Sequence, residues 1–466
     1  MTEFPPGWAE TRFAELGDVR LGKMLDKQKN SGVPVRYLRN INVRWFGFNL
    51  SDLQTILLSV DERRALSIED GDLLICEGGE PGRAAVWRGG PNNLTFQKAL
   101  HRLRPRTGVV PELLMYRLRA DAESGRLAEA FTGTTIKHLT GESLARYRIS
   151  IPPTGEQHRL VQKISNILGR ADACRLKLDR AHQNLKRFRE TVLEAAISGR
   201  LTREWRNGHE NAGEWVSTDI RSIARVGTGS TPSRSHSNFY SASGTPWITS
   251  AATSRPVVYQ AQEFVTEAAI KAHRLRVFPI GTLLVAMYGE GKTRGQVTEL
   301  GMQATINQAC AAVIVDSSIA RKEFVKLVLQ ANYMQMRALA EGGNQPNLNL
   351  SKIKQFPLSL PPMAEQEEIV GRVEELFALA DSLQRRHEHA LSQVIELTPS
   401  VLAKAFRGEL VPQDPNDEPA ARMLEQWKDS SRKLTQRAPQ ALAEKAARRV
   451  RTRSIQRSRR RTVALQ

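Results

Sequence analysis

The chain repeats itself, and this duplication restricts its possible folds more than any other feature of the sequence. Four short motifs recur without a gap at a separation of 209 residues: Ile151-Pro152-Pro153 with Leu360-Pro361-Pro362, Glu156-Gln157 with Glu365-Gln366, Ala171-Asp172 with Ala380-Asp381, and Gly199-x-Leu201 with Gly408-x-Leu410. Before each matched stretch the similarity is weaker, as between Gly71-x-Leu73-Leu74 and Gly281-x-Leu283-Leu284. A repeat of this kind predicts one structural plan used twice, with a variable part followed by a constant part.

The constant part of each repeat is predicted to be a long helix. Its apolar residues alternate by four and three steps from Leu160 to Ala195, which is the heptad period of a coiled coil. The second copy keeps this period from Ile369 to Val401, interrupted by His387. Two heptad helices on one chain most simply pair with each other in antiparallel fashion. The residues expected to pair the helices are Leu160, Ile164, Ile167, Leu178, Leu185, Phe188, Ile369, Val373, Leu376, Leu383, Val394 and Leu397.

Two residues disturb the second helix. His387 either sets the register of the pair or is a tolerated polar residue, and the second interpretation is preferred. Pro399 is expected to kink the helix near its last turns, because proline removes a backbone hydrogen bond.

The variable parts are predicted to be mixed α and β domains. Short apolar runs bounded by Gly-rich turns, at 72–76 and 282–286, are typical of strands, and the segments 111–130 and 321–340 have helical spacing. The expected fold class is α+β, with two mixed domains joined by two long helices paired as an antiparallel coiled coil. The expected organisation is a first domain at 1–150, spacer helix 1 at 151–207, a second domain at 208–359, spacer helix 2 at 360–412, a C-terminal helical segment at 413–444 and a basic, disordered tail at 445–466.

The charge balance favours a polyanionic partner. The chain has 68 Lys and Arg against 49 Asp and Glu, a formal net charge of +19, so nucleic acid is the first candidate. The tail from Lys445 to Gln466 holds nine of the cations and no acid, which suits binding to any phosphate backbone.

Other features place the chain among cytoplasmic proteins without a membrane partner. The N-terminus has neither a basic start nor an apolar stretch, and no apolar run approaches the length of a membrane span. Cys76, Cys174 and Cys310 have neither disulfide nor zinc spacing and are expected to be small buried hydrophobic residues.

One segment matches a relaxed phosphate-loop pattern, so a nucleotide-binding protein is an alternative. This is Ala286-x-x-x-x-Gly291-Lys292-Thr293, which follows a predicted strand. Against it, Gly295 and Val297 suggest a turn into another strand where a phosphate loop requires a helix.

Signatures of catalysis are missing from the sequence. It contains no Asn/Asp-Pro-Pro-aromatic or Pro-Cys segment for methyl transfer to a base, no His-Glu-x-x-His and no Gly-x-Ser-x-Gly. We therefore expect a chain that is not an enzyme, binds no metal and binds no cofactor.

The chain resembles the specificity subunits of type I restriction-modification systems. The resemblance lies in the order of variable domain and heptad helix, repeated once, with Pro-Pro-x-x-Glu-Gln opening both helices. Three further stretches are similar to what the family carries: 287–297, the expected strand Ile306-Asn307-Gln308-Ala309-Cys310, and 404–410. The arginine-rich tail departs from the family.

This resemblance implies two target-recognition domains, each reading one half of a bipartite, asymmetric site in double-stranded DNA. It also implies paired helices that dock two modification subunits, which transfer methyl groups from S-adenosylmethionine, and motor-nuclease restriction subunits that use ATP and magnesium. A stand-alone DNA-binding regulator with the same domains is the remaining alternative.

Residues that read base edges are expected in polar loops of the two domains, because Arg, Lys, Asn, Gln and Ser/Thr supply the necessary hydrogen bonds. The candidates in the first domain are Lys23, Arg36, Arg44, Trp45, Arg83, Gln97 and Lys98. Those in the second domain are Thr231, Arg234, Tyr288, Lys292, Thr293, Arg294, Gln296, Asn307 and Gln308.

Overall fold

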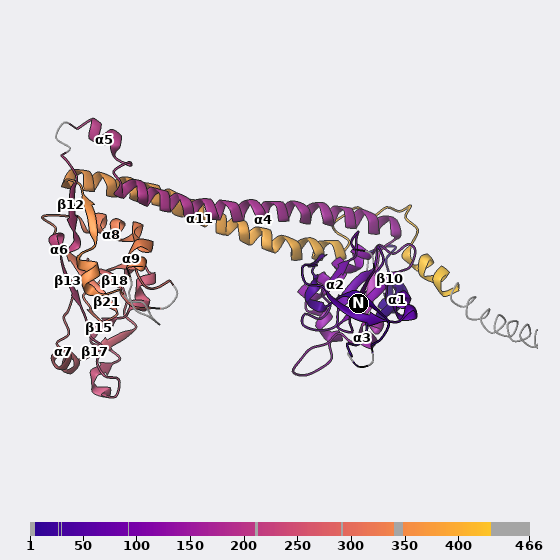
Figure 1. Ribbon diagram of the computed structural model, residues 1–466. Helices are drawn as coiled ribbons and strands as arrows, with labels where there is room; N and C mark the ends of the chain where they lie inside the picture. The colour runs from indigo at the N-terminus through magenta and orange to yellow at the C-terminus, as the bar shows by residue number, and fades with distance from the viewer. Residues whose placement is uncertain are drawn as a thin grey trace, which may run out of the picture. The chain divides into compact units, whose positions relative to one another are not determined.

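The chain divides into two compact units, and each of its two long helices lies partly in one unit and partly in the other (Figure 1). The computed structural model describes residues 5–26, 28, 30–91, 93–209, 213–289, 292–339 and 348–429. Unit 1 consists of Met1–Leu176 and Leu391–Gln466, and unit 2 of Lys177–Ala390. Helices α4 (Thr154–Ile197) and α11 (Met363–Phe406) therefore each contribute one part to both units.

Unit 1 contains the first variable domain, built on a four-stranded sheet of order β2-β10-β7-β8 and a three-stranded sheet of order β6-β3-β9. A third, two-stranded sheet pairs β1 with β11 and brings the two ends of the domain together. The strands are β1 (Ala9–Arg12), β2 (Gly17–Leu21), β3 (Val33–Leu38), β4 (Val43–Arg44), β5 (Gly47–Phe48), β6 (Gln54–Leu58), β7 (Leu73–Cys76), β8 (Ala84–Val86), β9 (Leu94–Phe96), β10 (Leu100–Pro105) and β11 (Arg148–Ile151), and the shorter helices are α1 (Val60–Ala65), α2 (Pro111–Glu123) and α3 (Gly141–Arg146).

Unit 2 repeats this plan in the second variable domain. Its sheets have the orders β13-β21-β18-β19-β16 and β14-β17-β15-β20, and β12 pairs with β22 as β1 pairs with β11. The strands are β12 (Val216–Asp219), β13 (Ala224–Thr228), β14 (Tyr240–Ser241), β15 (Thr245–Ile248), β16 (Val257–Val258), β17 (Glu263–Val265), β18 (Leu283–Ala286), β19 (Val297–Leu300), β20 (Thr305–Ile306), β21 (Cys310–Val315) and β22 (Pro357–Leu360), and the shorter helices are α5 (Arg203–Asn207), α6 (Ile220–Ile223), α7 (Glu267–His273), α8 (Lys322–Ala331), α9 (Tyr333–Ala338) and α10 (Leu350–Lys354). The predicted duplication and the α+β class are confirmed.

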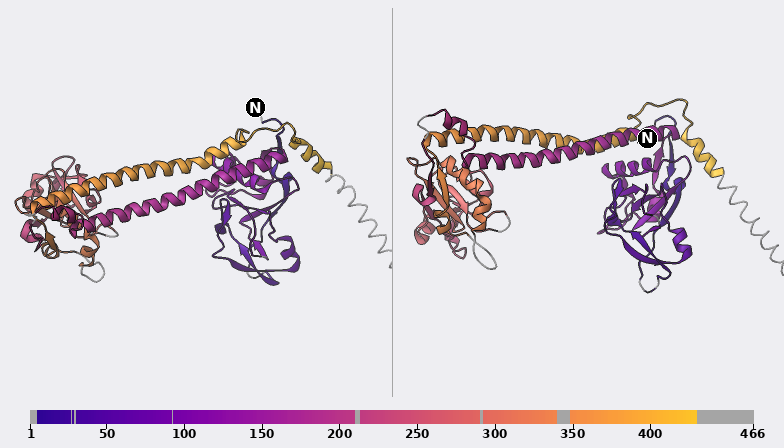
Figure 2. Two further views of the ribbon diagram at one scale, coloured as in Figure 1. Left: turned by 90° about the horizontal axis from the view of Figure 1, so that it is seen from above. Right: turned by 45° about the horizontal axis from the view of Figure 1, so that its top comes forward.

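The two long helices pack against each other within each unit, and Figure 2 shows them side by side there. In unit 1, Leu160 and Ile164 of α4 share a core with Val401 and Leu402 of α11. In unit 2, the later residues of α4, such as Val192, share a core with the earlier residues of α11 around Ile369 and Val373. Early residues of one helix thus meet late residues of the other, which is the antiparallel pairing expected from the heptads.

Burial along the predicted seam is uneven. Leu160, Ile164 and Ile369 are fully buried because a variable domain also packs on them. Leu383, in contrast, was predicted to be a pairing residue but is 40% exposed, so it is not buried in the seam. Where two helices meet without a domain above them, water reaches the flanks of the seam.

The second helix tolerates both of its unusual residues. Pro399 lies inside α11, which continues to Phe406. The Nε2 atom of His387 lies 3.0 Å from the carbonyl oxygen of Leu178, within hydrogen-bond distance, and its ring lies near that of His182. His387 is therefore a polar contact across the helix pair.

Three predicted elements are divided in the structure. The expected strand 306–310 is interrupted because Asn307 accepts a hydrogen bond from the Ala309 amide and forms a turn. The expected helix 111–130 stops at Glu123, since Gly125 adopts a φ of 78° and a short 3-10 helix (Arg126–Ala130) follows. The expected helix 321–340 consists of α8 and α9.

The end of the chain is described as far as residue 429. Residues 420–429 are helical, whereas residues 413–419, which were also predicted to be helical, form turns and irregular structure. The helix packs on the core of unit 1 through Ala420 and Leu424. The rest of the predicted segment and the basic tail at 445–466 lie outside the described residues.

One prediction about the cysteines is wrong. Cys76 and Cys310 are buried as expected, but Cys174 is exposed because its turn of α4 carries no domain. No helix in the described ranges combines the length and the apolar character needed to cross a membrane.

Candidate nucleic-acid interface

Three loops gather at one end of the four-stranded sheet in unit 1. Strands β2 and β7 end there and β10 begins there, because β10 runs antiparallel to both. We call the loops at 22–25, 77–83 and 97–99 loop face 1. The other end of β10 leads to Val110, whose amide donates a 2.9 Å hydrogen bond to Gln157 of α4. Loop face 1 therefore lies at the end of the sheet away from the helix pair.

Unit 2 has the same arrangement. Strands β13 and β18 end, and β21 and β19 begin, at one end of the five-stranded sheet. The described loops at 229–236, 287–289, 292–296 and 307–309 form loop face 2. At the opposite end, the amide of Arg321 donates a 2.7 Å hydrogen bond to Gln366 of α11, the counterpart of Gln157. The two helices carry their domains in the same way.

A turn of equivalent position forms the centre of each loop face. In unit 1, the Lys23 amide donates to the Phe96 carbonyl and the Lys98 amide donates to the Lys23 carbonyl, both at 2.9 Å, so Lys23, Gln97 and Lys98 are adjacent. In unit 2, the hydroxyl of Thr231 donates to the side chain of Gln308 in the matching turn. The structure thus brings together candidate residues from distant parts of the sequence.

Glycines allow this close approach of loop and turn. A Cβ atom on Gly22 would lie 2.2 Å from the carbonyl oxygen of Gln97, and one on Gly229 would lie 1.6 Å from that of Ile306. Both distances are impossible for a side chain. The two domains therefore share a backbone framework at the loop face, on which the side chains differ.

Two candidates in unit 1 have structural partners that compete with a role in base contact. Arg83 donates 2.9 Å and 2.8 Å hydrogen bonds to Glu80 and to the carbonyl of Asn40. The indole of Trp45 also donates to Glu80, and Arg119 stacks 4.9 Å from its ring centroid. These side chains hold the loop at 77–83 in place.

Several candidates in unit 2 are similarly anchored. Arg234 forms an ion pair with Glu263 at 2.8 Å and lies 5.0 Å from the ring centroid of Tyr240. Tyr333 donates a 2.6 Å hydrogen bond to the carbonyl of Lys292, and Arg337 donates one of 2.9 Å to that of Arg294. Helix α9 therefore holds the strand-to-strand connection that contains these candidates.

The remaining candidates differ in exposure. Thr293 and Gln296 are half-buried, and Gln296 lies 3.5 Å from the hydroxyl of Thr253. Lys23 is paired with Glu62. Within the described part of the chain, the exposed candidates without a side-chain partner are Arg36, Arg44 and Lys98 in unit 1, and Tyr288 and Lys292 in unit 2. These are the groups most available to DNA.

A further loop of unit 1 was not predicted. Residues 132–138 form a tight loop closed by reciprocal backbone hydrogen bonds between Thr132 and His138, of 2.8 and 2.9 Å. The next amide, of Leu139, donates to the carbonyl of Glu77, which attaches the loop to loop face 1. Ile136 is 66% exposed in it, beside exposed Lys137. The Gly-Thr-Thr run before Ile136 was the available turn signal.

The phosphate-loop alternative is contradicted by the strands around it. Strands β18 and β19 form an antiparallel pair, with Leu283 opposite Glu299 and Val285 opposite Val297. The predicted turn into another strand is confirmed. A phosphate loop needs the N-terminus of a helix at this point, so the segment cannot hold nucleotide phosphates in that way.

The two buried cysteines, Cys76 and Cys310, do not provide a nucleophile at neutral pH. Burial raises the pKa of the Cys76 thiol to about 11 and that of the Cys310 thiol to about 12, so both stay protonated. Among the described residues, no three His, Cys, Asp or Glu side chains gather as metal ligands.

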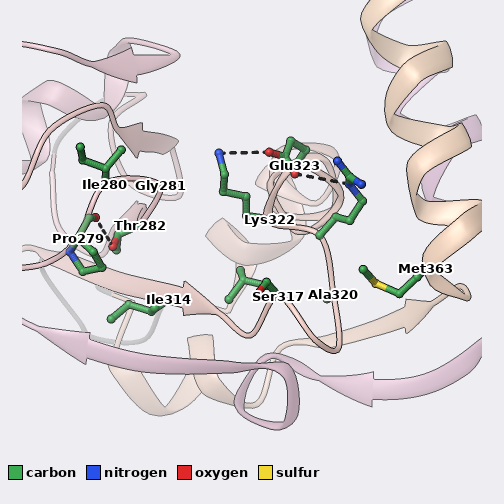
Figure 3. Close-up of a pocket in the computed structure, with 12 residues that line it drawn as sticks. Pro279, Ile280, Gly281, Thr282, Ile314, Ser317, Ala320, Lys322, Glu323 and Met363 are labelled. Carbon is green, nitrogen blue, oxygen red and sulfur yellow. Dashed lines mark hydrogen bonds and ion pairs between the residues drawn. The ribbon is translucent and has the colours of Figure 1, made fainter.

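The pocket in Figure 3 lies at the end of unit 2 opposite loop face 2. Its wall includes Pro279 and Ile280 before β18, residues just after β21, and Met363 at the start of α11. Its cations are paired within the protein: Lys322 with Glu299 and Glu323, and Arg321 with Glu323 and Glu367. This leaves little free positive charge for a phosphate backbone.

Comparison with known proteins identifies the family. The family model described as "Type I restriction modification DNA specificity domain" matches residues 5–178 and again 212–392. The specificity subunit of the type I restriction enzyme StySPI from Salmonella potsdam is 26% identical over 426 residues, which cover 88% of this chain and 91% of that relative. The EcoKI specificity subunit from Escherichia coli K12 is 26% identical over 440 residues, with the same coverage of both chains.

Solved structures show the same fold. A chain from a study of complex assembly and conformational transition in the type I R-M system aligns with a TM-score of 0.70 at 17% identity, covering 87% of this chain and 99% of that one. The HsdS subunit from Thermoanaerobacter tengcongensis aligns with a TM-score of 0.58 at 18% identity, covering 87% of this chain and 98% of that one.

Proposed function

The chain belongs to the family of type I restriction modification DNA specificity proteins, and from that premise we propose that each variable domain reads one half of a bipartite, asymmetric DNA site. The observation that best supports this proposal is the pair of equivalent turns at the centres of loop faces 1 and 2. One presents Gln97 and Lys98, the other Asn307 and Gln308. One backbone framework with different hydrogen-bonding groups suits two readers of different base sequences.

The chain acts with DNA and with other subunits of a restriction-modification complex. We propose that two modification subunits dock on the paired helices, and that they use S-adenosylmethionine while restriction subunits use ATP and magnesium. Exposed apolar residues on the helices support a docking role: Leu176 on α4 is 60% exposed, and Leu379 and Ile395 on α11 are 55% and 59% exposed. In this proposal the chain itself is not an enzyme, binds no cofactor and works in the cytoplasm.

Selection from a pool of random duplexes tests this function. The chain, purified with its modification subunit, is expected to select two short conserved blocks separated by a spacer of fixed length. The chain alone is expected neither to methylate nor to cleave DNA when S-adenosylmethionine, ATP and magnesium are supplied. Catalytic turnover that followed the chain through purification would contradict the proposal.

A domain exchange separates the two readers. Replacing residues 208–359 with the matching region of another family member is expected to change one block and leave the other intact, because each domain has its own core. A simultaneous change in both blocks would show that the domains do not read independently. Failure to co-purify with any modification subunit would favour the stand-alone regulator.

A further inference from the structure

A polar cavity lies in the second variable domain, outside every predicted site. It measures about 240 Å³ and lies between the 3-10 helix η5 (Ser250–Ser254) and the connection from β16 to β17. Its wall includes Trp247, Ile248, Arg255, Gln260, Gln262 and Glu263. The buried side chains of Trp247 and Ile248 form the apolar part of the wall, and polar side chains form much of the rest.

Three polar side chains of the wall have no hydrogen-bonding or ionic partner within the described part of the protein. Arg255, Gln260 and Gln262 are exposed, and in the part of the chain that the structure describes their side chains form no hydrogen bond or ion pair. Tyr259, beside them in the sequence, is 71% exposed. A guanidinium and two amides on one concave surface offer donors and acceptors to a ligand at little cost in folding stability.

The cavity adjoins loop face 2 through contacts of its lining residues. Two of its lining residues hold Arg234 of the loop face, since Glu263 pairs with that guanidinium and the ring of Trp247 lies 6.0 Å from it. A second contact joins them, since the amide of Asn307 in loop face 2 donates a 2.9 Å hydrogen bond to the carbonyl of Ile248. A duplex bound along loop face 2 would therefore border this cavity.

The matching region of unit 1 is organised differently. Tyr37 occupies the place of Trp247, because β3 runs parallel to β9 as β15 runs parallel to β20. There the polar groups satisfy one another: Arg39 pairs with Asp52, and the buried amide of Asn42 donates to the carbonyls of Asn49 and Asp52 at 2.9 and 3.1 Å. Free amides at this place are a property of the second domain.

We propose that the cavity is a base-reading pocket for the half-site of the second domain. Gln260 and Gln262 contact base edges in the major groove, where an amide pairs with the two hydrogen-bonding groups of adenine, and Arg255 contacts guanine or a neighbouring phosphate. The apolar wall suits a thymine methyl group. This inference rests on the proposed function and names the residues that give the second half-site its sequence.

The test compares preferred sequences for the parent and two variants in complex with the modification subunit. The variants are Gln260→Ala combined with Gln262→Ala, and Gln355→Ala as a control. Gln355 is also exposed, but it follows α10 next to α6, at the end of the domain away from loop face 2. The probe is a duplex pool that keeps the first half-site and the spacer and randomises the second half-site.

The double variant is expected to lose discrimination by about tenfold or more at one or two base pairs of the second half-site. Its first half-site and the salt dependence of its binding are expected to stay unchanged, since neither amide neutralises a phosphate. A double variant that binds DNA with the parent's full preference would overturn the base-reading pocket. If the parent itself selected no bipartite site, the proposed function would fail first.

Discussion

The indole of Trp8 donates a 3.0 Å hydrogen bond to the buried carboxylate of Glu156, and Trp215 makes the same contact with Glu365 at 2.9 Å. Each glutamate belongs to the first turn of a long helix and each tryptophan to the entry of the domain that packs on it. The residue that completes each site differs. Gln413 donates to Glu156, whereas Arg206 and Thr202 donate to Glu365. The same joint therefore occurs twice, and its glutamate is paired with a neutral amide in unit 1 and with a guanidinium in unit 2.

Replacing Glu365 is expected to destabilise unit 2 more than replacing Glu156 destabilises unit 1. Glu365→Gln removes the charge that Arg206 pairs with, at an expected loss of about 1–3 kcal/mol. Glu156→Gln keeps an acceptor for Trp8, and Gln413 can rotate its amide, so we expect a loss under about 1 kcal/mol. Calorimetric unfolding of the purified chain at neutral pH checks the order, and equal losses would contradict it.

The pH dependence of Glu156 is expected to be inverted relative to most carboxylates. Burial raises its pKa above 4.5, against the hydrogen bonds from Trp8 and Gln413. The folded state then binds this proton more tightly than the unfolded state, so this group's contribution to stability rises as pH falls through the raised pKa towards 4.5. Glu156→Gln should remove that contribution, and unfolding temperatures measured between about pH 7 and about pH 4 would reveal it.

The sequence allowed the duplication, the heptad helices and the class of the domains to be predicted, because periodicity depends on local spacing. It did not reveal that Arg83 and Trp45 share Glu80, since that contact joins loops from three parts of the chain. The Gln260 and Gln262 cavity was missed for the same reason. Whether an exposed amide borders a loop face is decided by sheet order, which local patterns do not determine.

Arg83 and Lys98 are expected to respond differently to truncation. Arg83→Ala removes two hydrogen bonds that hold loop 77–83 and should lower stability by about 1–2 kcal/mol. Lys98→Ala should change stability by under about 0.5 kcal/mol, because its side chain is exposed, and weaken DNA binding. Unfolding temperature and binding titrations, measured on both variants, separate the two effects. A stable Arg83→Ala variant with altered base preference would make Arg83 a reader.

Removing the basic tail at 445–466 is expected to flatten the salt dependence of DNA binding. The deleted segment holds nine Lys and Arg, and phosphate contacts raise affinity without distinguishing bases. The selected DNA sequence should stay the same. Binding titrations over a range of salt concentrations, together with selection from a random pool, check both parts, and a changed sequence would show that the tail reads DNA.

Matched insertions in the long helices test whether they set the spacing of the two half-sites. Seven residues added to both α4 and α11 keep the heptad register and lengthen each helix by about 10 Å, the length of about three base pairs. We expect the preferred spacer in the DNA site to lengthen accordingly, as measured by selection from a pool with randomised spacer length in the presence of the modification subunit.

Insertions of two residues are the control. At about 100° per residue, they rotate every later apolar residue of the helix by about 200°, which turns the later part of the seam away from the partner helix. Loss of folding or of assembly should therefore precede any change of spacer. If the seven-residue variant folded and bound DNA with the parental spacer, the partner subunits or the bending of the DNA would set the separation instead.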